Sequence, residues 1–194
     1  MVYFLVRIMR KEIKIAIKTL KAGGLLLYPT DTVWGVGCDA TNPKAVEKLY
    51  ALKKRSKSKA MVCLMADLKM VRNYVKEIPQ NIEDFLNQQT TPTTVIYNHP
   101  KNIAQNLLAK DDTIAIRICD NYFCQELFKH FKNPITSTSA NISGFPSPKT
   151  FSQISSEIIK GVDYVVNLQL ESVNTKPSKI IKLEVNGEIK IIRA

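Results

Sequence analysis

The side chains best suited to chemistry gather in a basic run at residues 53–59, whose sequence is Lys-Lys-Arg-Ser-Lys-Ser-Lys. Five cations in seven positions attract anions, and lysine and arginine are the side chains that most often bind phosphates in proteins. The dipole of a helix explains one or two cations at its C-terminal end, but not five. The run therefore predicts a contact with an anionic ligand.

Hydroxyl and amide side chains gather in two other stretches, each directly after an apolar run. Residues 30–32 are Thr-Asp-Thr, and Ser139 and Asn141 follow a second apolar run. In open α/β sheets, ligands bind at the carboxyl ends of the strands. A cleft lined by cations and hydroxyls binds phosphates and aligns reactants, and it needs no side-chain nucleophile. We interpret the nearby acids Asp31 and Asp39 as turn formers.

Other catalytic devices are absent from the sequence. It has no Gly-x-x-x-x-Gly-Lys-Ser/Thr loop, no Gly-x-Gly-x-x-Gly turn and no Gly-x-Ser-x-Gly elbow. The cysteines lie in or beside apolar runs without Cys-x-x-Cys spacing, so we expect small buried side chains, no disulfide framework and no metal ligands from side chains. We expect both histidines at the surface. These residues are Cys38, Cys63, Cys119, Cys124, His99 and His130.

Length and composition favour one domain with a substantial core. The chain has 194 residues, of which 45% are hydrophobic, and a formal charge of +11 at pH 7. This charge leaves two interpretations open, a polyanionic partner such as a nucleotide or RNA, and a lysine-rich solvated surface. The apolar residues 1–6 are too short for a secretory signal, and no later stretch approaches a membrane span. We therefore expect a reduced, cytoplasmic protein without membrane contact.

Periodicity and turn residues predict the elements that position these side chains. Apolar residues at helical spacing before Gly23-Gly24 predict a helix that ends there, and Asn42-Pro43 is a typical start of a second helix, which leads into the basic run. Further helices are predicted near residues 68–75, after Pro79, and at 122–131 and 150–161. Strands are predicted at residues 25–28, 60–65, 93–97, 113–118, 135–138 and 164–166, and a hairpin at 180–183 and 189–192 across Asn186-Gly187.

This alternation predicts an α/β fold: a single-domain twisted mixed sheet with flanking helices and a ligand cleft at the strand ends. Arg117 interrupts the strand predicted at residues 113–118, and a buried guanidinium group needs a carboxylate or phosphate partner. We interpret the polar segment 98–112 as a mobile loop. Trp34 is interpreted as a core or pocket-wall residue.

Taken together, the motifs resemble the YrdC-type threonylcarbamoyl-AMP synthases, which make the activated intermediate for threonylcarbamoyl modification of the tRNA adenosine beside the anticodon. The resemblance covers nearly the whole chain, and the order and spacing of the motifs make it specific. The matching motifs are Gly23-Gly24, Thr30-Asp31-Thr32 with Trp34-Gly35, Lys53-x-Arg55 with Lys59, Thr113 with Arg117, Ser139-x-Asn141, Pro146-Ser147-Pro148, Ser178 and Arg193.

The resemblance implies a single YrdC-like catalytic domain over residues 1–194 that acts as an L-threonylcarbamoyladenylate synthase, a nucleotidyltransferase. L-threonine and bicarbonate would give N-carboxythreonine, whose carboxylate attacks the α-phosphorus of ATP and releases pyrophosphate. ATP is then a substrate, and Mg²⁺ is implied with it. The product serves synthesis of tRNA threonylcarbamoyladenosine, so tRNA and the downstream threonylcarbamoyl transferase are implied as partners.

The resemblance also assigns roles to matching positions in this sequence. The residues expected to bind threonine are Thr30, Arg117, Ser137 and Ser178. The residues expected to bind ATP are Lys53, Arg55, Lys59, Thr113, Ser139, Asn141, Ser147 and Arg193. Lys53 and Arg55 are also expected to be catalytic, since they suit charge on phosphate oxygens, whereas Lys54 and Lys57 are expected to face solvent.

The sequence departs from the family pattern at several positions, and these departures alter loop stiffness or threonine contacts. They are Ser56, Ala60, Leu64, Cys119 and Lys179. The chain stops at Ala194, so we do not expect the additional C-terminal domain of longer members. Carbamoyl-transfer relatives from hydrogenase maturation carry added domains that 194 residues cannot hold. The alternative function is a non-catalytic RNA-binding YrdC-like protein that acts on tRNA or rRNA, with salt-sensitive binding that does not depend on threonine.

Overall fold

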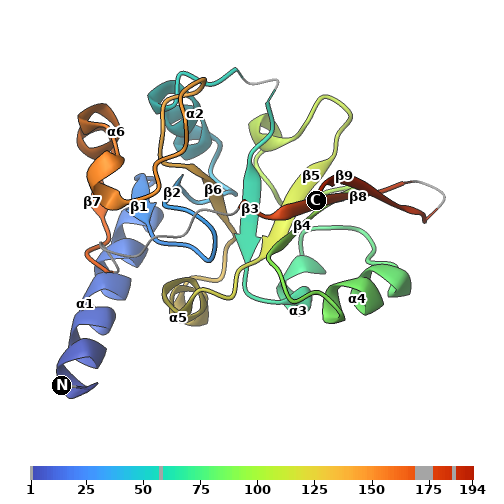
Figure 1. Ribbon diagram of the computed structural model, residues 1–194, viewed down its shortest axis with the longest axis horizontal. Coiled ribbons are helices and arrows are strands. Elements are labelled where there is room, and N and C mark those ends of the chain that lie inside the picture. The colour runs from blue at the N-terminus through green and yellow to red at the C-terminus, as the bar shows by residue number, and fades with distance from the viewer. Residues whose placement is uncertain (1, 57–58, 169–176, 185–186) are drawn as a thin grey trace.

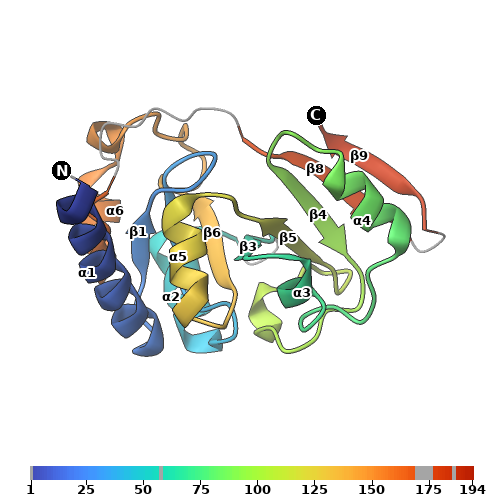
Figure 2. The same ribbon diagram turned by 90° about the horizontal axis from the view of Figure 1, so that it is seen from below.

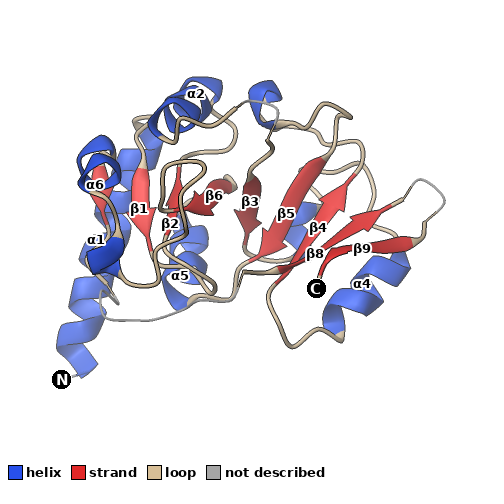
Figure 3. Cartoon of the chain, turned by 45° about the horizontal axis from the view of Figure 1, so that its top comes forward, coloured by secondary structure: helices blue, strands red, loops and turns tan. Residues whose placement is uncertain are grey.

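The computed structural model describes residues 2–56, 59–168, 177–184 and 187–194, and in this part of the chain one nine-stranded sheet forms the centre (Figures 1 and 3). Its strands run in the spatial order β7-β1-β2-β6-β3-β5-β4-β8-β9. Their bounds are β1 Leu26–Tyr28, β2 Gly35–Gly37, β3 Val62–Met65, β4 Thr93–Tyr97, β5 Ile114–Ile118, β6 Ile135–Ser139, β7 Tyr164–Val165, β8 Lys179–Leu183 and β9 Ile189–Arg193.

The sheet mixes parallel and antiparallel pairs, which confirms the predicted fold class. The pairs β1–β7, β3–β5 and β4–β8 are parallel, whereas β1–β2, β2–β6, β3–β6, β4–β5 and β8–β9 are antiparallel. The hairpin β8–β9 pairs Leu183 with Ile189, as predicted, although Asn186 of its turn lies outside the described residues. Parallel pairs need long connections, and helices supply several of them here.

Helices cover both faces of the sheet (Figure 2). On one face α1 and α5 pack over Leu26, Tyr28 and Leu64, and on the other face α2 packs over residues such as Leu27 and Cys63. Because successive residues of a strand point to opposite faces, both cores are built from the same strands. The helices are α1 Val2–Lys21, α2 Pro43–Leu52, α3 Leu68–Val71, α4 Gln80–Asn87, α5 Tyr122–His130 and α6 Ser156–Gly161, with the short 3₁₀ turns η1 Gln105–Leu107 and η2 Phe151–Gln153.

The helix ends follow the local signals in the sequence. The Asn42 side chain accepts hydrogen bonds from the N–H groups of Lys44 and Ala45, which caps α2 directly before Pro43. At the end of α1, Gly23 has a φ of 72°, and the N–H groups of Gly23 and Gly24 donate to the last-turn carbonyls. This is the left-handed stop that glycine permits. The predicted starts and stops of these two helices are therefore confirmed.

Three local predictions need correction. The helix predicted at residues 68–75 ends at Val71. The helix predicted at residues 150–161 begins only at Ser156, because the Ser155 side chain caps it there, and η2 precedes it. The segment 98–112 is not a loose loop, since Leu107 is fully buried in the core and the Ala104 N–H donates to the Ala40 carbonyl at 2.9 Å.

The cysteines, the tryptophan and the histidines have the burial and exposure that the sequence predicts. All four cysteines are free and buried, and Trp34 is only 3% exposed, with its ring edge-on to Phe151. His99 and His130 are exposed. Among the described residues, no helix has the length and apolar character needed to cross a membrane.

Candidate active site

Lys53 closes α2 and is buried, although it belongs to the basic run. Its Nζ donates to the Ser139 carbonyl, to the Asn141 carbonyl at 2.6 Å and to the Asn141 Oδ1 at 3.4 Å. Burial, together with the nearby Arg55 charge, lowers the pKa of Lys53 to about 7. The lysine therefore joins the end of α2 to the loop that follows β6.

The loop after β6 is held by its own side chains as well as by Lys53. Ser139 Oγ donates to Asn141 Oδ1 at 2.5 Å, and Asn141 Nδ2 donates to the Ile142 carbonyl at 3.1 Å. The Ser143 N–H in turn donates to the Lys53 carbonyl at 2.9 Å. Lys53 thus donates hydrogen bonds to this loop from its side chain and accepts one from the loop at its backbone carbonyl. A pocket of about 580 Å³ lies against Asn141, Ser143 and Lys54.

Arg55 and Lys59 shape the rest of the basic run. Arg55 Nε donates to the Lys59 carbonyl at 3.0 Å, and Arg55 Nη2 donates to the Ala60 carbonyl at 2.9 Å. Burial lowers the pKa of Arg55. The Lys59 side chain is exposed, and the exposed Lys54 pairs with Glu157 at 2.8 Å. Lys57 lies outside the described residues.

Arg117 lies in the middle of the sheet on β5 and is only 5% exposed. Its Nη2 contacts Asp31 Oδ1 at 3.0 Å, so the buried cation has the carboxylate partner that the sequence predicted. Arg117 Nε is buried, and none of the residues that the structure describes is its hydrogen-bond partner. A buried donor without an acceptor is costly, and a carboxylate oxygen of a ligand would satisfy it.

Asp31 corrects our interpretation of the two acids. Asp39 is a turn former, since its Oδ1 accepts from the Thr41 N–H at 2.8 Å and from the Thr41 hydroxyl at 2.7 Å. Asp31 instead pairs with Arg117 from a distant part of the chain. The signal that connects them was present: Arg117 required an anion, and Asp31 follows a buried strand.

Thr30 and Ser137 both lie next to Gly35. A Cβ built at Gly35 would lie 3.1 Å from Ser137 Oγ and 3.2 Å from Thr30 Cγ2, so the lack of a side chain there makes room for both. The Thr30 hydroxyl accepts from the Thr32 N–H at 3.1 Å and donates to the Val33 carbonyl at 2.8 Å, which fixes the loop after β1.

Ser178 and Arg193 lie on the Arg117 side of the site. Ser178 Oγ is 2.8 Å from Thr94 Oγ1, and Thr94 is the register partner of Arg117 on β4. Arg193 donates from Nε and Nη2 to the Ser178 carbonyl at 3.1 and 2.7 Å. The sequence reasoning did not single out Thr94, because only the sheet pairing brings it to Ser178.

The structure therefore divides the predicted site residues into two groups. The Lys53 group contains Lys53, Arg55, Lys59, Ser139 and Asn141, and the arginine group contains Thr30, Arg117, Ser137, Ser178 and Arg193. Arg193 was expected to bind ATP, but its contacts are to the arginine group.

Two further predicted site residues lie at the edge of the Lys53 group. Thr113 directly precedes β5, which pairs in register with β3, so it lies at the same end of the sheet as Ala60. Its hydroxyl donates to Asp111 Oδ1 at 2.8 Å. Ser147 is exposed between Pro146 and Pro148, which line the 580 Å³ pocket.

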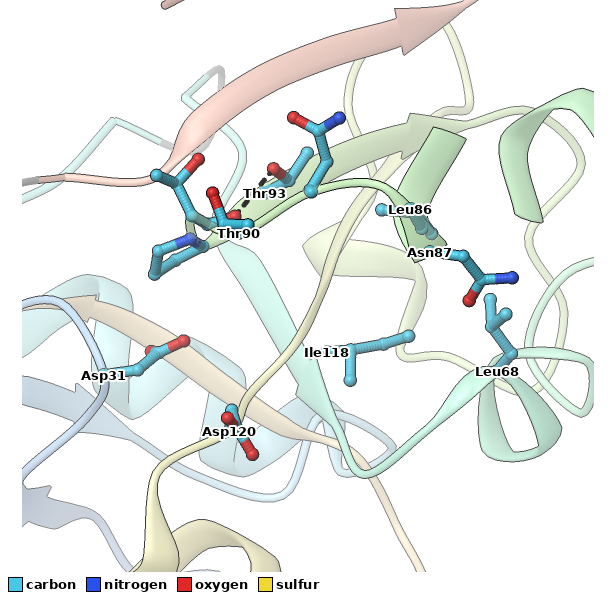
Figure 4. Close-up of a pocket in the computed structure, with 11 residues that line it drawn as sticks. Asp31, Leu68, Leu86, Asn87, Thr90, Thr93, Ile118 and Asp120 are labelled. Atoms are coloured by element: carbon cyan, nitrogen blue, oxygen red, sulfur yellow. Dashed lines mark hydrogen bonds between the residues drawn. The ribbon is translucent and has the colours of Figure 1, made fainter. Parts of the chain in front are cut away.

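A second pocket, of about 490 Å³, adjoins the arginine group (Figure 4). Asp31 and Asp120 lie on one side of it, and Thr90 and Thr93 lie on another. The carboxylate that binds Arg117 thus also lines an open space. Among the described residues, no cluster of three or more His, Cys, Asp or Glu side chains has the arrangement to hold a metal ion.

The fold and the site define a mixed α/β domain in which two buried cations, Lys53 and Arg117, contact residues that line ligand-sized pockets. The chain belongs to the Sua5/YciO/YrdC family, because the family model, described as telomere recombination, matches residues 18–194.

Curated relatives in this family are named threonylcarbamoyl-AMP synthase, which is an enzyme. The protein from Photobacterium profundum is 37% identical over 147 residues, which are 73% of this chain and 78% of the relative. The protein from Pseudoalteromonas translucida is 33% identical over 183 residues, which are 93% of this chain and 97% of the relative.

Solved structures support the fold. Two structures of P. abyssi Sua5, a variant and a complex with L-threonine, superpose with TM-scores of 0.83 and 0.82 at 25% and 24% identity. The matches cover 93% of this chain and 55% and 53% of the Sua5 chain. The present chain therefore spans about half the length of that Sua5.

Proposed function

We propose that the chain is an L-threonylcarbamoyladenylate synthase, a cytoplasmic nucleotidyltransferase that acts as one catalytic domain over residues 1–194. It converts L-threonine, bicarbonate and ATP into threonylcarbamoyl-AMP and pyrophosphate, for the synthesis of tRNA threonylcarbamoyladenosine. Membership of the Sua5/YciO/YrdC family and the names of relatives that align over most of the chain support this proposal.

One structural observation carries the proposal: β6 connects the two groups of site residues. Ser137 and Thr30 both lie next to Gly35, and Ser139, two residues after Ser137 on the same strand, accepts from Lys53. Two residues of a strand span about 7 Å. An amino acid held by the arginine group therefore lies within reach of a phosphate held by the Lys53 group.

In the proposed reaction, the arginine group holds threonine. The threonine carboxylate binds Arg117, whose buried Nε has no acceptor in the described part of the chain, and the serine and threonine hydroxyls complete the contact. The threonine amine attacks the carbon of bicarbonate-derived carbon dioxide and loses a proton to water, which gives N-carboxythreonine. P. abyssi Sua5, a protein of the same fold, has been solved with L-threonine.

The second step takes place beside the residues of the Lys53 group. A carboxylate oxygen of N-carboxythreonine attacks the α-phosphorus, and the bond from that phosphorus to the bridging oxygen breaks, so its electron pair leaves with pyrophosphate. Lys53, Arg55 and Lys59 offset the charge that develops on the phosphate oxygens. These side chains are cationic and suit no metal, so Mg²⁺ would be held by the phosphates of ATP.

Pyrophosphate release from ATP by purified protein tests the proposal. We expect release that depends on both L-threonine and bicarbonate, and we expect Arg55→Ala and Arg117→Ala each to lower turnover at least ~100-fold, in line with the loss of a preorganised charged contact. Lys69→Ala is the control, because Lys69 is exposed on α3. No release above background from the wild-type protein would refute the proposal.

A non-catalytic RNA-binding protein is the second candidate, and the formal charge of +11 favours it. It predicts tight, salt-sensitive RNA binding that is unaffected by Arg117→Ala. That candidate does not account for the buried pair of Arg117 and Asp31 beside a pocket. The assay above separates the two functions.

A further inference from the structure

The α1 helix carries a cationic stripe that the proposed reaction does not use. Its members are Arg7, Arg10, Lys11, Lys14, Lys18 and Lys21, all of them exposed, and we call them the α1 basic face. At 3.6 residues per turn these positions lie within an arc of about 100° on the helix surface. The stripe is therefore one continuous face.

The opposite side of α1 is covered by the protein. Ile13, Ala16 and Leu20 are buried in the core shared with α5, and Figure 2 shows α1 along the edge of the molecule beside α5. The one acidic residue of the helix, Glu12, is also buried, and its Oε2 accepts from the Tyr164 hydroxyl at 2.7 Å and the Asn167 N–H at 2.8 Å. No acid on the helix surface therefore offsets the stripe.

The dimensions of the stripe match a polyanion. From Arg7 to Lys21 the helix rises about 21 Å, and successive cations three or four residues apart lie about 5–6 Å from one another. Within the described part of the chain, none of the six cationic side chains pairs with a carboxylate. A nucleic-acid strand presents regularly spaced charges of the opposite sign over the same length.

We infer that the α1 basic face binds the phosphate backbone of structured RNA. A membrane surface fits less well, because an interfacial helix must insert an apolar face, and here residues such as Ala16 and Leu20 are covered. An acidic protein partner fits less well, because protein interfaces have an apolar centre and this stripe has only cations at its centre.

The choice of RNA rather than DNA rests on the proposed function, which serves tRNA modification. The face itself goes beyond that function, since the family match begins at residue 18 and four of the six cations precede it. Figure 1 shows that the N-terminal half of α1 projects away from the sheet, so a long ligand can lie along this part of the helix.

Binding of a fluorescein-labelled, unmodified tRNA transcript at several salt concentrations tests the inference. Six phosphate contacts give a slope of log K against log [salt] of about −4 to −5, and the triple variant Arg7→Gln/Arg10→Gln/Lys14→Gln should reduce its magnitude by about 2–3. The variant should weaken binding at least ~10-fold at low salt. The control triple Lys69→Gln/Lys76→Gln/Lys101→Gln removes the same charge from exposed positions elsewhere.

Several outcomes would overturn the inference: equal tRNA binding by the α1 triple variant and wild type, equal loss in the control triple, equally tight binding of duplex DNA, or binding to phosphatidylserine vesicles in place of tRNA. Pyrophosphate release is measured on the same preparations without RNA. Both triple variants should retain it, so loss of RNA binding and failure of the proposed reaction are told apart.

Discussion

The two groups of the site each bury a cation, but they compensate it differently. Lys53 is 1% exposed, and its partners are carbonyl and amide oxygens, which carry only partial charges. Arg117 is 5% exposed, and its partner is the Asp31 carboxylate. Burial lowers the pKa of Lys53 to about 7, and the nearby Arg55 charge adds to this effect, because dipoles offset the cost of burying a charge less than an opposite charge does.

This difference separates an adjustable cation from a fixed one. The guanidinium group of arginine is a permanent cation, so its position can hold a carboxylate under all ordinary conditions. Lys53 can lose its proton near neutral pH, and a phosphate that arrives beside it would restore the charge. We therefore propose that the arginine group is ready to bind an anion at any ordinary pH, whereas the Lys53 group would become fully charged only when an anionic ligand binds.

The largest effect is expected at the fixed cation. Arg117→Ala leaves Asp31 partly buried without its cation, and removal of one partner of a buried pair costs about 3–5 kcal/mol. We expect unfolding in urea at a correspondingly lower midpoint, together with loss of threonine-dependent pyrophosphate release. The double variant Asp31→Asn/Arg117→Gln is the control, and it should recover part of the lost stability. No recovery would show that the charge pair is not the cause.

A smaller effect is expected at the adjustable cation. Lys53→Met keeps the length of the side chain but removes the donors to the Ser139 and Asn141 carbonyls, and we expect a loss of about 1–3 kcal/mol at pH 8. Urea denaturation measures the stability, and pyrophosphate release should fall much further than the stability does. A loss as large as that of Arg117→Ala would remove the distinction between the two cations.

The pH dependence of stability tests the adjustable charge directly. A lysine whose pKa is lowered to about 7 in the folded state binds fewer protons than the unfolded chain between pH 7 and its ordinary pKa. Stability should therefore rise with pH in this window, by at most about 1.4 kcal/mol per pH unit from this group, and be lost as the pH falls through 7.

The difference between wild type and Lys53→Met isolates this term, because burial also raises the pKa of Cys38 and Cys63, and those groups lower stability at high pH in both proteins. Urea denaturation at pH 6, 7 and 8 gives the two curves. Parallel curves would contradict an adjustable Lys53.

The smallest effect is expected at Lys54, the residue that follows Lys53 in the sequence. Its ion pair with Glu157 joins side chains that are 64% and 51% exposed, and such surface pairs contribute about 0–1 kcal/mol. We expect Lys54→Ala to change stability by less than ~0.5 kcal/mol and to leave turnover within about twofold of wild type. A larger loss of turnover would show that Lys54 also belongs to the Lys53 group.

Local signals in the sequence predicted the elements but not most of their contacts. Asn42 and Gly23 determine helix ends through their immediate neighbours, so their effects could be predicted. Arg117 was correctly expected to need an anion, yet Asp31 lies 86 positions earlier and was read as a turn former. Lys53 was expected to face a triphosphate, and only the arrangement of β6 beside β3 shows that it binds the carbonyls after β6.

The order of the strands also has a consequence for synthesis on the ribosome. β6 lies between β2 and β3, although its residues are translated some 70 to 100 positions after theirs. Until residue 139 has left the exit tunnel, the nascent chain exposes unpaired edges of both strands. Such edges favour aggregation, and long-range pairing folds slowly. The contact between Ser139 and Lys53 therefore forms late. A translation product that ends before residue 139 cannot form the complete Lys53 group.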